Sequence, residues 1–341
     1  METNYYYEQQ LSEAAQALKN GQLIAFPTET VYGLGANALL PEAVAQVFSV
    51  KDRPQDNPLI VHVSSFEQVK SYVDNFHPLT EKIVKNFWPG PLTLIFKIKK
   101  GGLPAIVTGG LSTAAFRMPD NKKTLQVIKL AKVPIVGPSA NTSGKPSPTT
   151  AEHVYHDLQG KITGIIDDGA TRIGVESTVI DLSDPMSEPM ILRPGAVTKE
   201  QLEAAIGGKV TIDQHLIQSS ETPKSPGMKY RHYSPDTTVM MVYEEDWQEA
   251  IKWAKDNQLR VGVIAGPKIA ESVRFDVAAV YMYFDDSVKA ATQGLFAGLR
   301  SLDEKMLGLD LIFVEVFSEE GLGNAYMNRL RKSAGQKYFE K

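Results

Sequence analysis

The chain has 341 residues, a hydrophobic content of 43% and a formal net charge of −4. This composition excludes a disordered or fibrous protein, and the length is sufficient for two domains with buried cores. The chain contains no cysteine, which excludes disulfide bonds and cysteine-ligated zinc and is typical of a reducing compartment.

The charge is spread evenly along the chain. Residues 1–206 hold 19 Lys and Arg against 21 Asp and Glu, which leaves 17 against 19 for the remainder. Neither half has the positive charge of a dedicated nucleic-acid binder. No run of eighteen apolar residues occurs, and the amino-terminal sequence lacks the basic start and apolar stretch of a signal peptide. We therefore expect a cytoplasmic protein with no membrane contact.

Up to about Ile206, short apolar runs alternate with helical patterns, which predicts a layered α/β domain over residues 1–206. The predicted strands span residues 22–26, 59–63, 92–98, 114–118, 133–136, 164–167, 177–182 and 190–193. The predicted helices span residues 8–20, 41–50, 66–75, 79–87, 122–131, 151–158 and 198–205.

A stretch with little periodicity, residues 207–237, ends in SPGMKYRHYSP and reads as a linker. Its aromatic and basic residues are unusual for a passive connection. The α/β pattern then restarts over residues 238–341, which predicts a second domain with a small parallel sheet. The predicted strands are 239–243, 260–264, 277–283 and 311–314, and the predicted helices are 246–257, 287–306 and 324–333.

The first motif, PTETVYGLGANA, lies between a predicted strand and a predicted helix. It contains Gly33-x-Gly35-x-x-Ala38, a loose match to the dinucleotide fingerprint. The acidic residue that the fingerprint requires about twenty positions later is replaced by the basic segment KDRPQDNP, which disfavours a nicotinamide site. Thr28 and Thr30 follow the strand end, where α/β proteins bind ligands, although both also suit a simple turn.

The second motif contains Lys51 and Arg53, followed by Asn57 and a strand that contains His62. In an extended segment, side chains two residues apart point to one side, so Lys51 and Arg53 would form a clamp for a polyphosphate. An ordinary pair of solvated cations is the alternative. His62 shares a strand face with Ile60, and the sequence fits a core histidine and a site histidine equally well.

The third motif, GPSANTSGKPSPTT, spans residues 137–150 and is rich in hydroxyls, glycine and proline. Ser139, Asn141 and Ser143 alternate along it, and Ser147 precedes the predicted helix 151–158. This pattern fits a cradle of hydroxyls and N–H groups for phosphate oxygens, and it also fits a surface loop with helix caps. It is not a Walker P-loop, because no Gly-x4-Gly-Lys-[Ser/Thr] occurs in the chain.

Three shorter segments add cations and hydroxyls at strand ends. Thr113 and Arg117 flank an apolar strand, Ser177 opens another, and Arg193 ends a third before a turn. The histidines lack metal-ligand spacing, and no Gly-x-Ser-x-Gly elbow of a serine hydrolase occurs. The residues alone thus predict an α/β enzyme with a cationic, hydroxyl-rich anion site.

Seven motifs in order carry a resemblance to a known family: PTETVYGLGANA, KDRPQDNPLIVHV, WPGPLTLIF, FRMPDN, GPSANTSGKPSPT, GVESTVIDL and LRPGAV. Together they resemble the YrdC-type L-threonylcarbamoyladenylate synthases. The linker and the segment GLGNAYMNRLRKSA resemble the two-domain version of that family. The resemblance implies a twisted, mixed-sheet α/β catalytic domain and a smaller Rossmann-like domain.

The implied reaction is a nucleotidyl transfer that converts L-threonine, bicarbonate and ATP to L-threonylcarbamoyl-AMP and pyrophosphate. The product would go to a transferase complex that modifies tRNA beside the anticodon, and Mg²⁺ would accompany ATP. By motif, the implied ATP-binding residues are Lys51, Arg53, Asn57, Thr113, Ser139, Asn141, Ser147 and Arg193, with Lys51 and Arg53 as the catalytic pair. The implied threonine-binding residues are Thr28, His62, Arg117 and Ser177, with Tyr230 or Tyr233 as a lid over the nucleotide.

Two other functions remain open at this point. The hydrogenase-maturation carbamoyltransferases contain a similar module, but they also carry cysteine-rich zinc fingers, which a chain without cysteine lacks. A non-catalytic RNA-binding module, or a weak RNA contact, would use the same cationic cleft, and the balanced charge of both halves counts against it.

Overall fold

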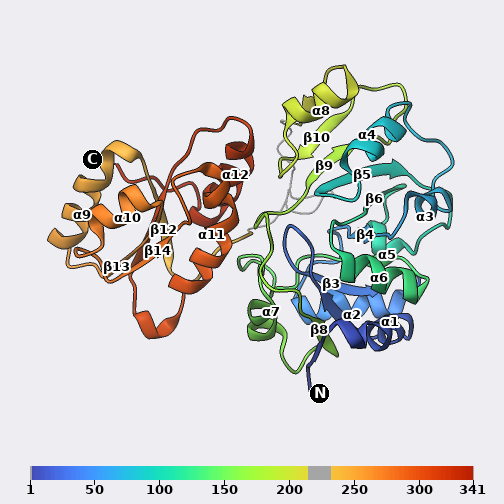
Figure 1. Ribbon diagram of the computed structural model, residues 1–341, viewed down its shortest axis with the longest axis horizontal. Coiled ribbons are helices and arrows are strands. Elements are labelled where there is room, and N and C mark those ends of the chain that lie inside the picture. Colours follow the sequence, from blue (N-terminus) through green and yellow to red (C-terminus); the bar gives the residue numbers. More distant parts are fainter. Residues whose placement is uncertain (1, 214–231, 341) are drawn as a thin grey trace. The chain divides into compact units, whose positions relative to one another are not determined.

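The computed structural model describes residues 2–213 and 232–340, which divide into two units (Figure 1). The first unit contains residues up to Ser143, the segment Pro148–Arg172 and the described residues from Glu176 to residue 213. The second unit contains residues 232–340 together with two short segments from earlier in the chain, Gly144–Ser147 and Ile173–Val175.

The first unit is built on a mixed sheet, which confirms the predicted α/β class. The strands described there are β1 Asn4–Tyr6, β2 Ile24–Phe26, β3 Gly33–Asn37, β4 Ile60–His62, β5 Leu92–Lys97, β6 Thr113–Arg117, β7 Ile135–Val136, β8 Gly164–Ile166, β9 Thr178–Asp181, β10 Met190–Arg193 and β11 Thr211–Ile212. Their order across the sheet is β1-β8-β2-β3-β7-β4-β6-β5-β9-β10-β11.

Helices cover this sheet and bury its core. They are α1 Leu11–Lys19, α2 Pro41–Lys51, α3 Phe66–Lys70, α4 Thr80–Phe87, α5 Ala105–Thr108, α6 Lys122–Ala131, α7 Ala151–Leu158 and α8 Lys199–Ile206. Four of them begin at a Ser, Asn or Thr whose side chain accepts a backbone N–H of the first turn. Apolar residues of α1 and α6 pack on β2, while a larger core cluster holds α2 against β3 and the central strands.

Residues 33–37 form strand β3, although the sequence predicts a loop there. The strand pairs antiparallel with β2 and with β7, so partners distant in sequence override the low strand preference of its two glycines. Glycine is required here because a Cβ on Gly33 would lie 2.6 Å from the ring of Phe26. Gly33 and Gly35 therefore lie inside an antiparallel strand, and not in the turn between a strand and a helix that the dinucleotide fingerprint requires.

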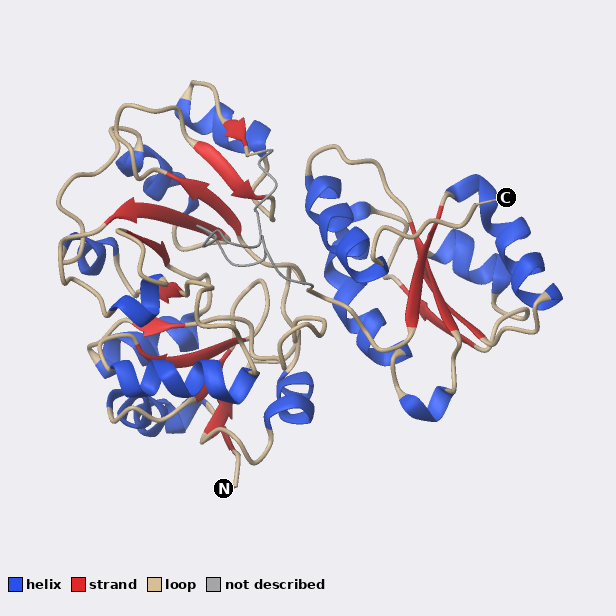
Figure 2. Ribbon diagram, turned by 180° about the vertical axis from the view of Figure 1, so that it is seen from behind, coloured by secondary structure: helices blue, strands red, loops and turns tan. Residues whose placement is uncertain are grey.

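The second unit contains a smaller sheet whose paired strands are all parallel. Its strands are β12 Thr238–Val242, β13 Val261–Ala265, β14 Ala279–Met282 and β15 Leu311–Glu315, in the order β12-β15-β13-β14. The helices α9 Trp247–Asp256, α10 Pro267–Val273, α11 Val288–Leu302 and α12 Leu322–Ala334 lie on both sides of it (Figure 2). This is the predicted Rossmann-like layer arrangement, with α10 as a helix that the sequence did not indicate.

One acidic side chain makes the stability of the chain depend on pH. Glu315 ends β15, is 8% exposed and accepts the N–H of Gly266 at 2.7 Å. Burial raises the pKa of Glu315 from 4.5 to about 7, against the opposing effect of that N–H. Between those two pH values the folded chain holds a proton that the unfolded chain releases, so this group makes stability fall as pH rises through that window.

We expect Glu315→Gln to remove most of this decrease, because a neutral amide keeps the acceptor without the buried charge. The loss of unfolding free energy between pH 5 and pH 8 should shrink by about 1–2 kcal/mol in urea titrations of the full chain. The exposed Glu304 offers a matched control, Glu304→Gln, that should leave the decrease unchanged. An equal pH dependence in the wild type and Glu315→Gln would contradict the assignment.

Candidate functional site

The candidate site lies on the sheet face of the first unit that the main core does not cover. Along β4, Val61 belongs to the main core, whereas Ile60 packs with Ala115 and Val179 in a small separate cluster. His62 shares the face of Ile60, and Arg117 shares the face of Ala115, because side chains two apart in a strand point the same way. The small cluster thus forms an apolar floor beside a histidine and an arginine.

Strand pairing brings the polar residues to one end of this floor. His62 and Arg117 are the last residues of the parallel strands β4 and β6 and are direct partners in register. Strand β5 is antiparallel to β6 and begins there, and its first residue pairs with Thr178 of β9. Ser177, which precedes β9, therefore lies at the same end as Arg117.

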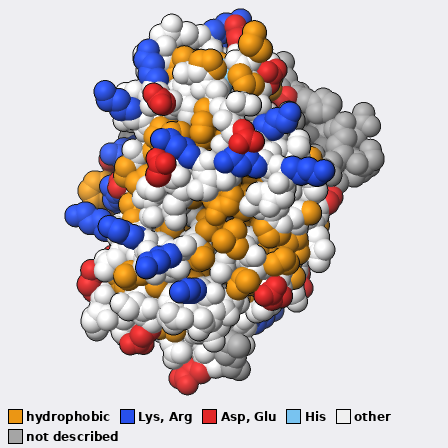
Figure 3. Space-filling view, turned by 90° about the vertical axis from the view of Figure 1, so that its right-hand side faces the viewer, with side chains coloured by type: hydrophobic (Ala, Val, Ile, Leu, Met, Phe, Trp, Pro, Cys, Tyr) orange, Lys and Arg blue, Asp and Glu red, His pale blue; other side chains and the backbone are white. Residues whose placement is uncertain are grey.

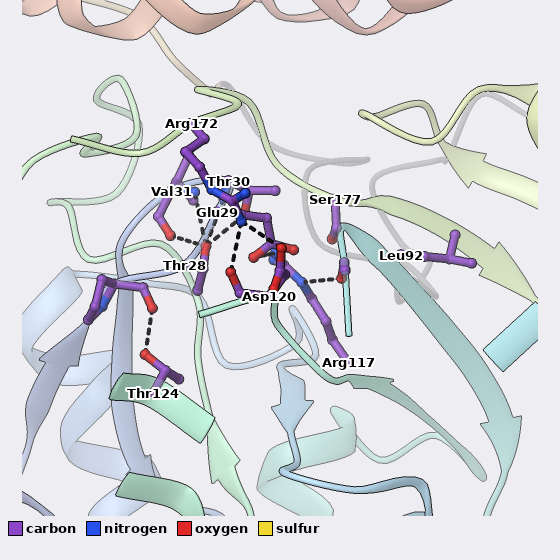
Figure 4. Close-up of polar contacts among 12 residues, drawn as sticks. Thr28, Glu29, Thr30, Val31, Leu92, Arg117, Asp120, Thr124, Arg172 and Ser177 are labelled. Atoms are coloured by element: carbon purple, nitrogen blue, oxygen red, sulfur yellow. Dashed lines mark hydrogen bonds and ion pairs between the residues drawn. The ribbon is translucent and has the colours of Figure 1, made fainter. Parts of the chain in front are cut away.

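Arg117 is buried against an acidic residue that the sequence did not indicate. Glu29, in the loop after β2, places its Oε2 atom 2.8 Å from Arg117 Nη2, and the two side chains are 2% and 5% exposed (Figure 4). Arg117 Nε also donates to the carbonyl of Gly90 at 3.4 Å. Because a guanidinium has five N–H donors, Arg117 can keep Glu29 as its counterion and still donate to a substrate carboxylate.

Thr28 shapes the loop that carries Glu29. Its hydroxyl accepts the N–H groups of Thr30 and Val31 and donates to the carbonyl of Val31 at 2.6 Å (Figure 4). These three bonds form a compact hydroxyl-closed turn. The Thr28 hydroxyl is therefore bonded to groups of its own loop. The hydroxyl of Thr30, which is fully buried, lies 2.9 Å from it.

His62 is neutral in this environment. Burial, followed by the charge of Arg117, lowers its pKa from 6.5 to about 3. Its ring packs edge-on against Phe26, and a Cβ on Gly137 would lie 2.7 Å from the His62 Nδ1 atom, so glycine is required at that position. A neutral imidazole in this position is a hydrogen-bonding group and not a cation at physiological pH.

The depressed pKa of His62 predicts a loss of stability in mild acid. Below pH 6.5 the unfolded chain binds a proton at His62 that the folded chain refuses until about pH 3, so stability falls as pH falls through that window. His62→Gln should reduce the loss of unfolding free energy between pH 7 and pH 5 by about 2 kcal/mol. The exposed His156 supplies the control variant His156→Gln. If His62→Gln and His156→Gln both lose as much unfolding free energy between pH 7 and pH 5 as the wild type, the lowered pKa of His62 is contradicted.

Lys51 is hydrogen-bonded to the hydroxyl-rich loop of residues 137–150. The prediction that Lys51 lies in an extended segment is wrong: it is the last residue of α2, and Asp52 follows in the left-handed conformation. The buried ammonium of Lys51 donates to the carbonyl of Ser139 at 2.5 Å and to that of Asn141. The helix continues through Lys51 because Val47, Phe48 and Lys51 itself are buried, and tertiary packing overrides the short-range pattern.

Arg53 contacts a different segment from the one that Lys51 contacts. Its Nη2 atom donates to the carbonyls of Asn57 and Pro58, at 3.4 and 3.2 Å. The side chain of Asn57 is buried, and its Oδ1 atom has no hydrogen-bond partner among the described residues. Such an acceptor, buried and unsatisfied, is a place where a ligand donor would be stabilised.

Ser177 and Arg193 form a second hydrogen-bonded group. Arg193 ends β10, and its Nη2 atom donates to the carbonyl of Ser177 at 2.9 Å and to its hydroxyl at 3.1 Å. The Ser177 hydroxyl also lies 2.8 Å from that of Thr93 on β5. A Cβ on Gly195 would lie 2.2 Å from the backbone nitrogen of Thr178, so the LRPG turn needs glycine to pack this closely.

Thr113 begins β6 and Arg117 ends it. Because a strand rises about 3.3 Å per residue, the two lie about 13 Å apart on the same face. The residues assigned to the nucleotide and to the amino acid therefore lie along one strand, and a ligand that reaches both is longer than an amino acid.

Three of the predicted residues fall outside this group. Tyr230 lies outside the described residues. Ser147 and Tyr233 belong to the second unit, where Tyr233 has a φ of 64° and stacks on Phe296 with ring centroids 5.1 Å apart. In the same unit, Arg300 donates to the carbonyl of Pro146 at 2.7 Å, so the second unit holds the segment that carries Ser147.

Charge and metal-ligand patterns limit the remaining alternatives. On the face shown in Figure 3, Lys and Arg side chains are interspersed with Asp and Glu, with an apolar area between them, which is unlike the single-sign patch of a nucleic-acid binder. No group of three or more His, Cys, Asp or Glu side chains suited to a metal ion occurs in residues 2–213 and 232–340. None of the described helices combines the length and apolarity needed to span a membrane.

Glu29 and Thr93 are parts of the site that no sequence pattern indicated. Glu29 was overlooked because an acidic residue in a strand-end loop is usually solvated, and its burial depends on Arg117, 88 residues later. The available signal was the placement of Glu29 between two threonines in a segment flanked by apolar residues. Thr93 gave no signal, since a threonine in an apolar strand is ordinary.

Comparisons with known proteins identify related families and proteins. The Sua5–YciO–YrdC family profile, described as "Telomere recombination", matches residues 16–195, and one described as "Threonylcarbamoyl-AMP synthase, C-terminal domain" matches residues 197–335. The protein "Threonylcarbamoyl-AMP synthase" of Pyrococcus abyssi is 46% identical over 334 residues, covering 96% of this chain and 94% of that protein. The protein of the same name from Bacillus subtilis is 44% identical, covering 96% and 93%.

Solved structures show the same similarity over both units. The crystal structure of P. abyssi Sua5 complexed with L-threonine matches with a TM-score of 0.90 and 43% identity, covering 99% of this chain and 100% of that one. The structure of a variant of P. abyssi Sua5 with two alanine substitutions matches with a TM-score of 0.90 and 42% identity, covering 99% and 98%.

Proposed function

The chain belongs to the Sua5–YciO–YrdC family and to its threonylcarbamoyl-AMP synthase members, and on that premise we propose that it converts L-threonine, bicarbonate and ATP to L-threonylcarbamoyl-AMP, water and pyrophosphate. The observation that carries the proposal is the buried Arg117 at the end of an apolar sheet face, beside the neutral His62 and the hydroxyl of Ser177. An amino acid carboxylate is a suitable partner for such an arginine.

The chemistry requires positioning more than a protein nucleophile. The amine of threonine attacks the carbon of bicarbonate, and loss of hydroxide with an amine proton gives the carbamate and water. A carbamate oxygen then attacks the α-phosphate of ATP, and the bond to the leaving pyrophosphate breaks, so the step is a nucleotidyl transfer. Holding two anionic reactants together against their repulsion calls for fixed cations and donors.

The proposed amino-acid subsite consists of Arg117 for the carboxylate, with Ser177 and His62 beside it as hydrogen-bonding groups. Thr28 supports it by closing the loop turn. The proposed nucleotide subsite consists of Arg53, Asn57, Thr113, Ser139, Asn141 and Arg193. Lys51 acts in that subsite by fixing the loop that carries Ser139 and Asn141.

We further propose that Mg²⁺ enters with ATP and is held mainly by phosphates and water, since the described residues offer no ligand cluster of their own. The product is consumed by a transferase that modifies tRNA beside the anticodon, and the reaction takes place where ATP and tRNA occur, in the cytoplasm.

The proposal is tested by measuring pyrophosphate release from ATP and Mg²⁺ with each co-substrate omitted in turn. We expect release to require both bicarbonate and L-threonine, and to be much lower with L-serine or L-valine. Omission of Mg²⁺ in the presence of a chelator tests the metal separately. Release that is independent of threonine would contradict the proposed reaction.

A further inference from the structure

Glu29 is a buried carboxylate that the proposed reaction does not yet use. It is 3% exposed, and neither of its oxygens has a hydrogen-bond donor at acceptable geometry within residues 2–213 and 232–340, although Oε2 lies 2.8 Å from Arg117 Nη2. A buried carboxylate is stable only when it is both paired and hydrogen-bonded. The ion pair meets the first requirement, and the missing donors leave room for a ligand that supplies them.

The charges around Glu29 indicate the kind of donor. Arg117 lies on one side, and the pKa of Arg172 is raised by its hydrogen bond with Asp120 and further by the charge of Glu29 (Figure 4). With Asp120 on Arg172 and Glu29 on Arg117, the group carries no net charge. A neutral zwitterion preserves that balance, whereas a simple carboxylic acid adds one negative charge.

An amino acid bound by its carboxylate to Arg117 brings its ammonium group within a few ångströms of the same guanidinium. Two cations this close repel each other unless an anion lies between or beside them. Glu29 is the acidic side chain in ion-pair contact with Arg117. An ammonium group carries three donors and no acceptor, which matches two carboxylate oxygens that lack donors.

We propose that Glu29 binds the α-ammonium group of the amino-acid substrate while Arg117 binds its carboxylate, so that the pair selects a zwitterion. This inference rests on the proposed function, because it assumes that the amino acid binds at Arg117. The role is one of substrate recognition at Glu29, and it adds a specificity-determining residue to the site.

The test removes the charge from the protein and from the ligand separately. Binding of L-threonine is measured by calorimetry on the full chain, without ATP and in buffer free of carbon dioxide, and compared with its hydroxy-acid analogue, in which a hydroxyl replaces the ammonium group. The wild type should prefer L-threonine by about 10- to 100-fold, the range for a hydrogen bond between charged groups. Glu29→Gln should weaken L-threonine by a similar factor and the analogue by less than about threefold.

Controls separate this role from a structural one. If Glu29 only holds Arg117 in place, Glu29→Gln weakens both ligands equally, and the inference is overturned. Glu29→Asp keeps the charge and should restore part of the preference for L-threonine. The exposed Glu188 provides the matched control Glu188→Gln, which should change neither affinity.

Two further outcomes are informative. Should Glu29→Gln fail to fold, as judged by circular dichroism, the wild type alone decides, since equal affinity for the two ligands overturns the inference. Should the wild type bind no L-threonine at all, the proposed function itself fails. The two failures are therefore distinguishable.

Discussion

Replacing Arg117 with methionine should abolish threonine-dependent pyrophosphate release, lowering kcat/KM for threonine by about 1,000-fold or more. The same change should destabilise the fold by about 3–5 kcal/mol, because it leaves the buried carboxylate of Glu29 without its counterion. Methionine keeps most of the side-chain volume, so the loss reports on the charge and not on a cavity. Activity assays and urea titrations measure the two effects.

A double variant separates these two effects of Arg117. Adding Glu29→Gln to Arg117→Met removes the orphaned charge and should recover most of the lost unfolding free energy without restoring activity. Single and double variants of equal stability would show that the ion pair carries no coupling, and would contradict the buried pair as described.

Replacing Lys51 with methionine should lower threonine-dependent turnover by about 100-fold, the loss expected when a binding loop shifts by about 1 Å. The ammonium of Lys51 donates to the carbonyls of Ser139 and Asn141, and methionine retains only the apolar stem. The two carbonyls then lose a buried charged donor, so stability should also fall, by about 2–3 kcal/mol.

The Lys51 prediction is checked by the KM for ATP and by kcat, measured beside the exposed control Lys161→Met. A rise in the KM for ATP with the KM for threonine unchanged would agree with a loop that serves the nucleotide. A Lys51→Met enzyme within about threefold of the wild type in both constants would remove the loop from the account.

Much of the fold was predictable because periodicity reports which face of an element is buried. The alternation in residues 59–63 places Val61 on one strand face and His62 on the other. In the structure Val61 lies in the main core, and His62 lies on the opposite face with Ile60. Helices 122–131 and 151–158 were predicted at their observed bounds, because Asn121 and Thr150 mark their starts. Buried faces and helix starts of this kind depend on neighbouring residues, so they can be predicted from a single sequence.

The remainder depends on partners far apart in the chain. Strand β3 is stabilised by β2 and β7, and its glycines alone predict a loop. The local sequence around Lys51 is typical of an exposed cation. Its burial depends on the carbonyl of Ser139, which lies 88 residues later in the chain. The contacts of Gly144–Ser147 lie with the second unit, which no local pattern could indicate. These features depend on tertiary contacts, which override the short-range preferences of the sequence.

The identity of the nucleotide product distinguishes the proposed reaction from other uses of ATP. The full chain is incubated with ATP, Mg²⁺, L-threonine and isotopically labelled bicarbonate, and the nucleotide products are analysed by mass spectrometry. We expect a single species that contains AMP, threonine and one labelled carbonyl carbon, formed in equal amount with pyrophosphate. Unlabelled threonyl-AMP, or AMP and ADP alone, would contradict it.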